Sequence, residues 1–315
     1  MNIWSTADPA SRAARQKECE PGWLAEPAAV RVIAPTQITS PLVFAFPHSG
    51  RQYSASFLQQ SRLDPLTLRS SEDAYVDQLF PASALPGASF VHAMFPRAWL
   101  DANRHPEALD PDMFIGSLGG SAGQRQSPQV LAGLGVIPKV VAQGKEIYAG
   151  KLRRGEINWR LSVAHTPYHQ AVADALSRAR DRFGVSVLVD CHSMPAICAA
   201  QTPAGPIDVV VGNRHGQSCD PMVSKVLGEL LQAQDLRTAS NVPYAGGYSV
   251  LQHSDSDRGA HAIQIELCRA LYMDEQSIKK HEGFAQTQGR MITIMQRLDH
   301  AVRENLVSEP SGLAQ

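Results

Sequence analysis

Short apolar segments alternate along the chain with longer stretches in which apolar and polar residues follow a helical spacing. Residues 42–46 form a continuous apolar run between two prolines, which has the length and the flanking chemistry of a buried strand. Similar runs predict strands over 30–33, 88–95, 185–190, 207–212 and 262–267. Most of these strands are therefore expected to lie inside the protein.

Two segments between the strands predict helices with defined ends. Ser70 precedes two acids, and this order predicts a helix that begins there and continues to Phe80, because serine caps a helix and acids suit its positive end. The apolar spacing over 155–183 predicts a pair of helices that is interrupted at Thr166 and Pro167.

The remaining segments complete the pattern. Residues 221–234 predict a helix, and 275–307 predict a long amphipathic helix that closes the domain. Residues 105–150 are rich in Gly, Pro, Ser and Gln and show little periodicity. Because so long a loop inside a compact domain is usually functional, we interpret it as a candidate lid.

Strands that alternate with helices indicate an α/β fold in which one domain contains a mixed, mostly parallel sheet flanked by helices. The chain has 315 residues, enough for such a domain with a substantial core. We expect an N-terminal arm that ends in a first strand over 1–40, a catalytic domain over 41–307, and a tail over 308–315.

Charge and cysteine usage narrow the class of protein. The formal net charge is −1, so no surplus charge favours nucleic acid or an anionic membrane as a partner. The five cysteines are scattered and odd in number, which favours a reducing compartment over a disulfide framework. No signal peptide or apolar membrane span is evident, so we expect a cytoplasmic protein.

Two histidines occupy positions at or near the carboxyl ends of predicted strands. His48 directly follows the strand 42–46, and His192 follows the strand 185–190 within the sequence Asp-Cys-His-Ser. Ligands of such sheets bind beyond the carboxyl ends of the strands, so both imidazoles are candidate metal ligands. Asp190 could orient the ring of His192. Each histidine alone could equally serve in a turn or in the core.

Acidic residues could complete such a centre. Glu72 and Asp73 begin the helix predicted from Ser70, where either could bind a metal or simply cap the helix. Glu266 lies in the apolar strand 262–267, where an unpaired acid is costly to bury. It could act as a general base, or it could form a buried ion pair with Arg269.

A third polar concentration follows the strand 88–95. Arg97, Asn103 and Arg104 could bind a substrate carboxylate, since guanidinium and carboxylate form two parallel hydrogen bonds. Surface arginines are the plainer alternative. The other histidines receive no role; in particular, Pro167 is expected to keep His165 and His169 off a common helical face.

Six short motifs resemble, in order, those of the N-formylglutamate amidohydrolase family. They are Pro-His-Ser-Gly at 47–50, Ser-Glu-Asp-Ala-Tyr-Val-Asp at 71–77, Pro-Arg-Ala-Trp-Leu-Asp-Ala-Asn-Arg at 96–104, Asp-Cys-His-Ser-Met-Pro at 190–195, Pro-Tyr-Ala-Gly-Gly-Tyr at 243–248 and Ala-Ile-Gln-Ile-Glu-Leu at 262–267. The resemblance implies a phosphorylase/hydrolase-like fold related to zinc carboxypeptidases and aspartoacylases. It also implies cleavage of N-formyl-L-glutamate to formate and L-glutamate, late in histidine breakdown.

The resemblance further implies roles for single residues. His48 and His192 match the metal histidines of a centre that binds one zinc ion. Asp73 looks like the third metal ligand, with Glu72 as the alternative. Glu266 resembles the general base. Arg97, Asn103 and Arg104 would then bind the carboxylates of a small N-acyl amino acid.

One segment departs from the family pattern. Residues 251–255 replace the His-Tyr-Gly segment that family members usually carry after Gly-Gly-Tyr. If this segment contacts the substrate, the chain could act on a different N-acyl amino acid, or it could be a non-catalytic member that binds a metal or ligand.

Overall fold

A seven-stranded sheet with the order β1-β3-β2-β4-β7-β5-β6 forms the centre of the computed structural model, which describes residues 28–116, 127–200 and 205–307. Its strands are β1 (Val30–Ile33), β2 (Leu42–Phe46), β3 (Ser89–Ala93), β4 (Ser186–Met194), β5 (Val209–Gly212), β6 (Thr238–Ser240) and β7 (Ala260–Cys268). Every predicted strand is present, and the α/β fold class with a mixed, mostly parallel sheet is confirmed.

The direction of the strands brings the polar motifs to one end of the sheet. Strands β3, β2, β4 and β7 are mutually parallel neighbours. Strand β1 runs antiparallel to β3, and β5 runs antiparallel to β7 but parallel to β6. The carboxyl ends of the four parallel strands therefore meet at the same edge. His192 of β4 pairs in register with Glu266 of β7 at this edge.

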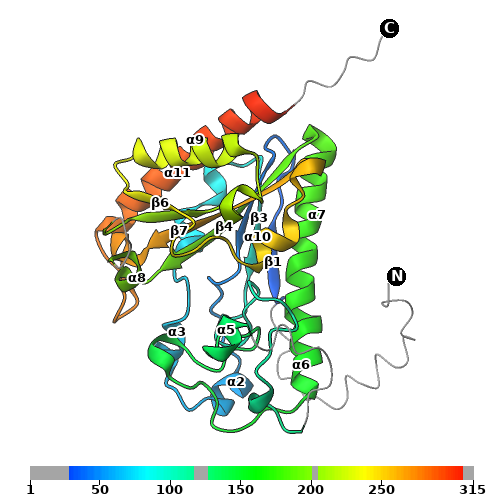
Figure 1. The fold of residues 1–315 in the computed structure, drawn as a ribbon, viewed down its shortest axis with the longest axis vertical. Helices are drawn as coiled ribbons and strands as arrows, with labels where there is room; N and C mark the ends of the chain where they lie inside the picture. The colour runs from blue at the N-terminus through cyan, green and yellow to red at the C-terminus, as the bar shows by residue number, and fades with distance from the viewer. Residues whose placement is uncertain (1–27, 117–126, 201–204, 308–315) are drawn as a thin grey trace, which may run out of the picture.

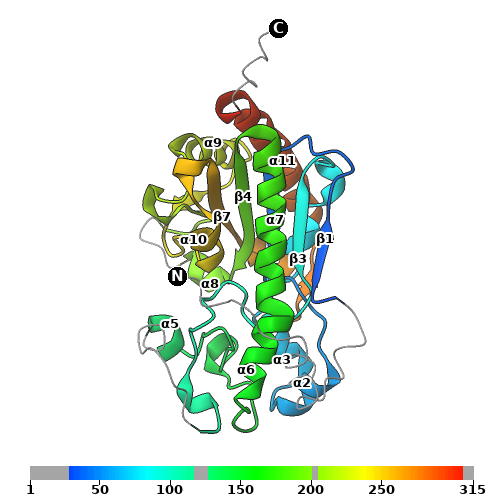
Figure 2. The ribbon, with the colours of Figure 1, turned by 90° about the vertical axis from the view of Figure 1, so that its right-hand side faces the viewer.

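Helices cover both faces of the sheet. Helix α7 (Thr166–Phe183) packs against β2, β3 and β4 on one face (Figure 2). Helices α9 (Pro221–Gln232) and α11 (Gly283–Leu306) pack together on the other face (Figure 1). Each face buries its own apolar cluster, and β2 supplies alternate side chains to the two clusters, Phe44 to one and Val43 to the other.

Shorter helices gather beyond one end of the sheet (Figure 1). They are α2 (Ala55–Gln60), α3 (Pro65–Arg69), α5 (Pro128–Leu131) and α6 (Gly155–Arg160). The segment 105–150, predicted as a long loop, contributes α5 and short 3-10 turns here, and residues 117–126 of it lie outside the described part. Its role as a lid stays a prediction.

The helix predicted from Ser70 to Phe80 is wrong for most of its length. Ser70 instead ends α3, and only α4 (Val76–Leu79) is helical further on. The backbone N–H of Asp73 donates to the carbonyl of His48, and Tyr75 adopts a left-handed conformation with φ of 66°. A tertiary contact thus outweighs the local capping signal.

The predicted interruption at Thr166 and Pro167 is also wrong. Helix α6 continues through a π-helical turn, Leu161–His165, directly into α7, and Pro167 lies in the first turn of α7. The π-turn is a place where the regular helical hydrogen-bond pattern is already altered, so proline, which lacks an N–H, is accommodated there.

Two further boundaries differ from the prediction. Strand β4 continues past residue 190 to Met194, so His192 lies within the strand and not after it. The last helix begins at Gly283, because residues around Lys279 and Lys280 pair as strand β9 with β8 (Met273–Asp274).

Most of the arm and the whole tail predicted at the chain ends, 1–27 and 308–315, lie outside the described residues, and the domain boundaries there stay predictions. Among the residues that are described, no helix combines the length and the apolar character needed to cross a membrane.

Gly50, just after β2, occupies a position where the backbone of another segment passes very close. A Cβ atom there would lie 2.2 Å from the carbonyl oxygen of Phe95 and 2.7 Å from that of Ala93. Backbone atoms cannot move far to relieve such a clash. We therefore expect Gly50→Ala to lower the free energy of unfolding by about 3 kcal/mol, at the upper end of the usual cost of overpacking. Urea denaturation measures this change.

Gly228 of α9 provides the matched control, since an added Cβ meets nothing within 4 Å. Gly228→Ala is expected to leave stability unchanged or to raise it by up to about 1 kcal/mol, because alanine favours a helix. Equal stability of Gly50→Ala and the wild type would contradict the steric argument.

Candidate active site

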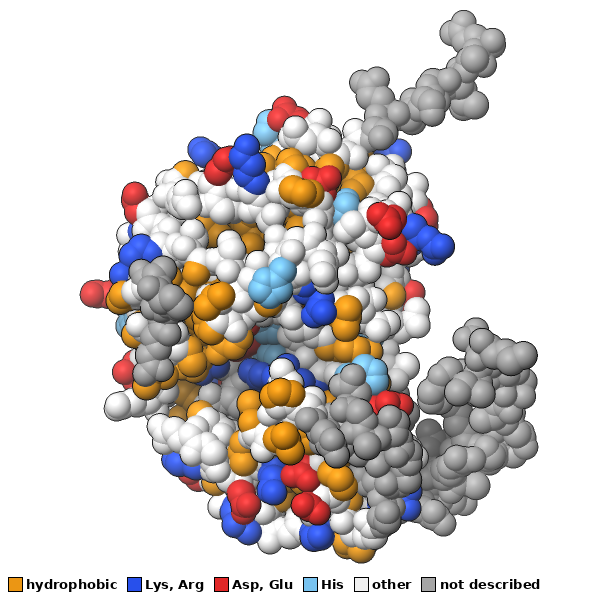
Figure 3. All heavy atoms as spheres, viewed as in Figure 1, with side chains coloured by type: hydrophobic (Ala, Val, Ile, Leu, Met, Phe, Trp, Pro, Cys, Tyr) orange, Lys and Arg blue, Asp and Glu red, His pale blue; other side chains and the backbone are white. Residues whose placement is uncertain are grey.

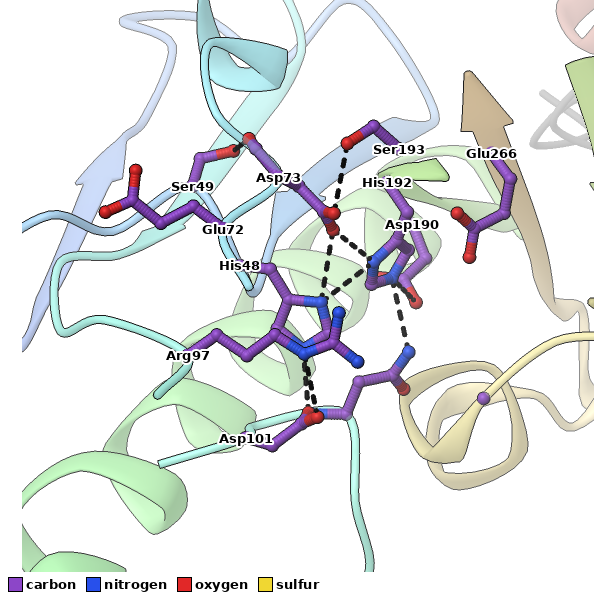
Figure 4. A network of polar contacts seen from close by, with 12 residues as sticks. His48, Ser49, Glu72, Asp73, Arg97, Asp101, Asp190, His192, Ser193 and Glu266 are labelled. Atoms are coloured by element: carbon purple, nitrogen blue, oxygen red, sulfur yellow. Dashed lines mark hydrogen bonds and ion pairs between the residues drawn. The ribbon is translucent and has the colours of Figure 1, made fainter. Parts of the chain in front are cut away.

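Two histidines and one aspartate from three separate segments meet at the carboxyl edge of the sheet (Figure 4). Nδ1 of His48 lies 3.1 Å from Nδ1 of His192, and Oδ2 of Asp73 lies 3.1 Å and 2.9 Å from these two nitrogens. All three residues are buried, with exposed fractions of 2% or less. The predicted metal ligands are therefore brought together.

Each imidazole is held from behind by a second carboxylate. Nε2 of His48 lies 2.7 Å from Oδ1 of Asp101, and Nε2 of His192 lies 2.9 Å from Oδ2 of Asp190. Asp190 and His192 share one face of β4 because they are two residues apart in a strand. Carboxylates in these positions fix the ring orientation and keep the proton on Nε2.

The positions of the protons on His48 and His192 determine whether the two rings can bind a cation. Burial acts to raise the pKa of Asp101, but the hydrogen bond from His48 and the charges of Arg97 and Arg104 outweigh it and hold that pKa well below its usual range. Asp101 is thus a carboxylate that only accepts, so His48 donates from Nε2. The Nδ1 lone pairs of both histidines then face the carboxylate of Asp73.

This donor set fits a divalent cation. Two imidazole lone pairs and one carboxylate oxygen within 3.1 Å of one another repel unless a positive charge lies between them. Their separations allow all three atoms to reach one ion at the roughly 2.0–2.2 Å typical of zinc bound by nitrogen and oxygen. Three protein ligands leave a fourth position open, as in catalytic zinc sites.

The second oxygen of Asp73 is anchored separately. Oδ1 accepts hydrogen bonds from the Ser193 hydroxyl at 3.1 Å and from the buried Arg269 guanidinium at 3.3 Å. Glu72, the alternative to Asp73, points away and binds Tyr53 and Arg69.

Glu266 lies beside this centre on the neighbouring strand (Figure 4). Oε1 of Glu266 accepts a hydrogen bond from Gln264 at 2.7 Å. Burial raises the pKa of Glu266 to about 7; the negative charge of Asp73 adds to this effect, and the positive charge of Arg97 acts in the opposite direction. Arg269, suggested as its ion-pair partner, instead contacts Ser193, Asp73 and backbone carbonyls of 70 and 72.

The three residues predicted to bind substrate line the same cavity, which has a volume of about 710 Å³ (Figure 3). Arg97 binds Asp101 through Nε at 3.0 Å, and its two terminal nitrogens have no hydrogen-bond partner among the described residues. Arg104 binds the carbonyls of Leu134 and Asn103. The Asn103 amide nitrogen lies 3.2 Å from His192 Nε2.

Sequence reasoning missed Asp101, Ser193 and Arg269 as parts of the site. An acid four residues after Arg97 in a polar motif was the available signal for Asp101. Residues 251–255, suspected of contacting substrate, do not line the cavity; instead the segment just before them, 243–247, does.

An α/β domain with two histidines, a carboxylate and a further buried acid at the carboxyl edge of its sheet has the layout of a hydrolase. Residues 40–273 match the family described as "FGase: N-formylglutamate amidohydrolase". The chain belongs to the N-formylglutamate amidohydrolase family, as its motifs predict.

Individual relatives agree with this assignment. The chain is 28% identical over 246 residues to an N-formylglutamate deformylase of Pseudomonas putida, with 75% of this chain and 82% of that protein covered. It is 25% identical over 244 residues to one of Pseudomonas aeruginosa, with 75% and 84% covered. A solved N-formylglutamate amidohydrolase from Ralstonia eutropha JMP134 superposes with a TM-score of 0.82 at 31% identity, covering 89% of this chain and all of that one.

Proposed function

We propose that this protein is a zinc-dependent amidohydrolase that cleaves N-formyl-L-glutamate to formate and L-glutamate. The observation that carries the proposal is the convergence of His48 Nδ1, Asp73 Oδ2 and His192 Nδ1 beside Glu266, in a cavity lined by arginines. The names of the relatives from Pseudomonas putida and Ralstonia eutropha support the same substrate.

His48, Asp73 and His192 would hold the metal, with Asp101 and Asp190 behind the two rings. When bound, zinc lowers the pKa of a water ligand toward about 7 and polarises the formyl carbonyl. Glu266 accepts the proton of the attacking water and hands it to the leaving amine nitrogen. The cleaved bond is the amide C–N bond, so formate and the free amino group of glutamate are the products.

Arginines would orient the substrate. The terminal nitrogens of Arg97 face the cavity beside His48, so they suit one carboxylate of the glutamate moiety (Figure 4). Arg104, which lines the same cavity and is held by two backbone carbonyls, suits the other. Asn103, which also lines it, would help to bind these groups.

The direct test is release of formate or acetate from a panel of N-formyl and N-acetyl amino acids, assayed with zinc added and after chelation. We expect N-formyl-L-glutamate to have the highest kcat/KM, followed by N-formyl-L-aspartate, and we expect chelation to abolish turnover. A preference for an N-acyl amino acid with an apolar side chain would contradict the assignment of two arginines to two carboxylates.

The buried position of Glu266 predicts the pH dependence of the reaction. A general base works only as the carboxylate, and burial raises the pKa of Glu266 to about 7. We therefore expect kcat/KM to fall about tenfold per pH unit as the pH decreases below about 7. The residual activity of Glu266→Gln is expected to lack this acidic limb, and a wild-type rate that stays constant down to pH 5 would contradict the assignment.

A further inference from the structure

Three histidines form a cluster directly behind the segment 101–104. His165 and His169 belong to the π-turn and to α7, and His253 ends α10 (Tyr248–His253). The ring centroids of His165 and His169 are 4.5 Å apart, and those of His169 and His253 are 5.2 Å apart. The continuous helix places His165 and His169 on one face, contrary to the sequence-based expectation, and the proposed chemistry uses none of the three.

The hydrogen bonds of this histidine cluster have a defined direction. Nε2 of His165 lies 2.9 Å from the carbonyl oxygen of Arg104, and Nε2 of His169 lies 2.8 Å from that of Ala102. A carbonyl oxygen only accepts, so both rings donate from Nε2. Nδ1 of His169 is then free to accept a hydrogen bond from Nε2 of His253, at 2.9 Å.

The segment 101–104 lies between the histidine cluster and the metal centre. Its carbonyls bind the cluster, while Asp101 reaches forward to His48 at 2.7 Å and the Asn103 amide approaches His192 at 3.2 Å. Arg104 lines the cavity from the same segment. A shift of the two carbonyls would therefore move one carboxylate that orients a metal histidine and one arginine assigned to the substrate.

We propose that His165 and His169 are positioning residues that hold the carbonyls of Arg104 and Ala102, and thereby fix the direction of Asp101 and Arg104. This inference rests on the proposed function, because it assigns the effect to the metal centre and the substrate carboxylate. His253 supports His169 from outside.

The environment of the histidine cluster suits neutral rings that each donate one proton. Burial lowers the pKa of His165, lowers that of His169 well below its usual range, and lowers that of His253 to about 4. A neutral ring in a single tautomer keeps one donor aimed at its carbonyl, whereas an added proton on Nδ1 of His169 would confront the donor of His253.

The test compares His169→Leu with His169→Gln, and His165→Leu with His165→Gln. Leucine removes the donor, whereas the glutamine amide can place a donor near the position of Nε2. The readouts are the Kd for Co²⁺ from the visible absorption of the bound ion, and separate kcat and KM values for N-formyl-L-glutamate. Circular dichroism and thermal unfolding show that each variant is folded.

We expect the leucine variants to bind Co²⁺ about 10-fold to 100-fold more weakly, the usual effect of losing a group that supports a metal ligand. We expect KM to rise as Arg104 loses its support, and we expect glutamine to restore most of both losses. Folded leucine variants with wild-type Kd and KM would overturn the proposal, as would glutamine variants no better than leucine. If His169→Leu does not fold, the comparison of His165→Leu with His165→Gln tests the proposal.

His261 gives a matched control for a merely structural effect. It is also buried and also bonds to a backbone group, the N–H of Asp220, but it lies at the amino end of β7. His261→Leu is expected to lower the melting temperature without changing the Co²⁺ Kd; a loss of Co²⁺ affinity equal to that of His169→Leu would overturn the proposal. The substrate assay of the wild type separates this proposal from the proposed function. If the wild type hydrolyses none of the substrates, the proposed function is contradicted, but the Co²⁺ Kd values of the variants still test the positioning role.

Discussion

Replacing Glu266 with glutamine is expected to lower kcat by about 10² to 10⁴-fold while the protein keeps its metal, the usual effect of losing a general base. The change is nearly isosteric. Glutamine at this position still offers an oxygen to the amide of Gln264, which now bonds to Glu266 at 2.7 Å, so the local packing should persist. Steady-state kinetics and metal analysis of the same preparation measure the two quantities.

Two comparisons sharpen this prediction. Glu266→Asp keeps a carboxylate but withdraws it by one methylene, so we expect a rate between those of the wild type and Glu266→Gln. KM should change little in either variant, because the arginines assigned to the substrate belong to other segments. A kcat of Glu266→Gln within threefold of the wild type would exclude Glu266 as the base.

Replacing His192 with alanine is expected to remove the metal and reduce turnover to the limit of detection. The free energy of zinc binding to a structural site with four ligands is roughly 10–16 kcal/mol. One ligand therefore contributes about 3 kcal/mol of binding free energy, which corresponds to about 10²-fold in affinity. The loss is compounded because the variant leaves the carboxylates of Asp73 and Asp190 buried without the ring between them.

The measurement is zinc content after dialysis, together with zinc titration and formate release. His261→Ala removes another buried histidine, from the adjacent strand, and is expected to retain both zinc and activity. His192→Ala that keeps one zinc per chain after dialysis would contradict the ligand assignment. High zinc concentrations are expected to restore only a small part of the activity, since one coordinating group is permanently missing.

Local sequence patterns were sufficient where burial alone decides the conformation. The apolar run 42–46 forms β2 with the predicted ends, because flanking prolines limit it and every residue of it is buried. The same reasoning located the helix α9 to within a few residues. Strand β1 also has the predicted ends, although its two middle residues are exposed. It failed at Ser70, where the N–H of Asp73 bonds to His48, a partner 25 residues away in the chain.

The candidate site was likewise predictable from the sequence only in part. Motif order placed His48, His192 and Glu266 at strand ends, and the parallel sheet brings such ends together. The choice between Glu72 and Asp73 could not be made from the sequence, since adjacent residues in a turn point in different directions. The structure directs Asp73 to the histidines and Glu72 to Tyr53.

By itself, then, the sequence determined the class of fold, the family and the residue types of the centre, because these depend on local burial and on motifs in a fixed order. Only the tertiary structure decided which carboxylate faces the histidines, which acid supports His48, and that His165 and His169 share one face behind residues 101–104. These features depend on hydrogen bonds between segments far apart in the chain. No local pattern of apolar and polar residues encodes such partners.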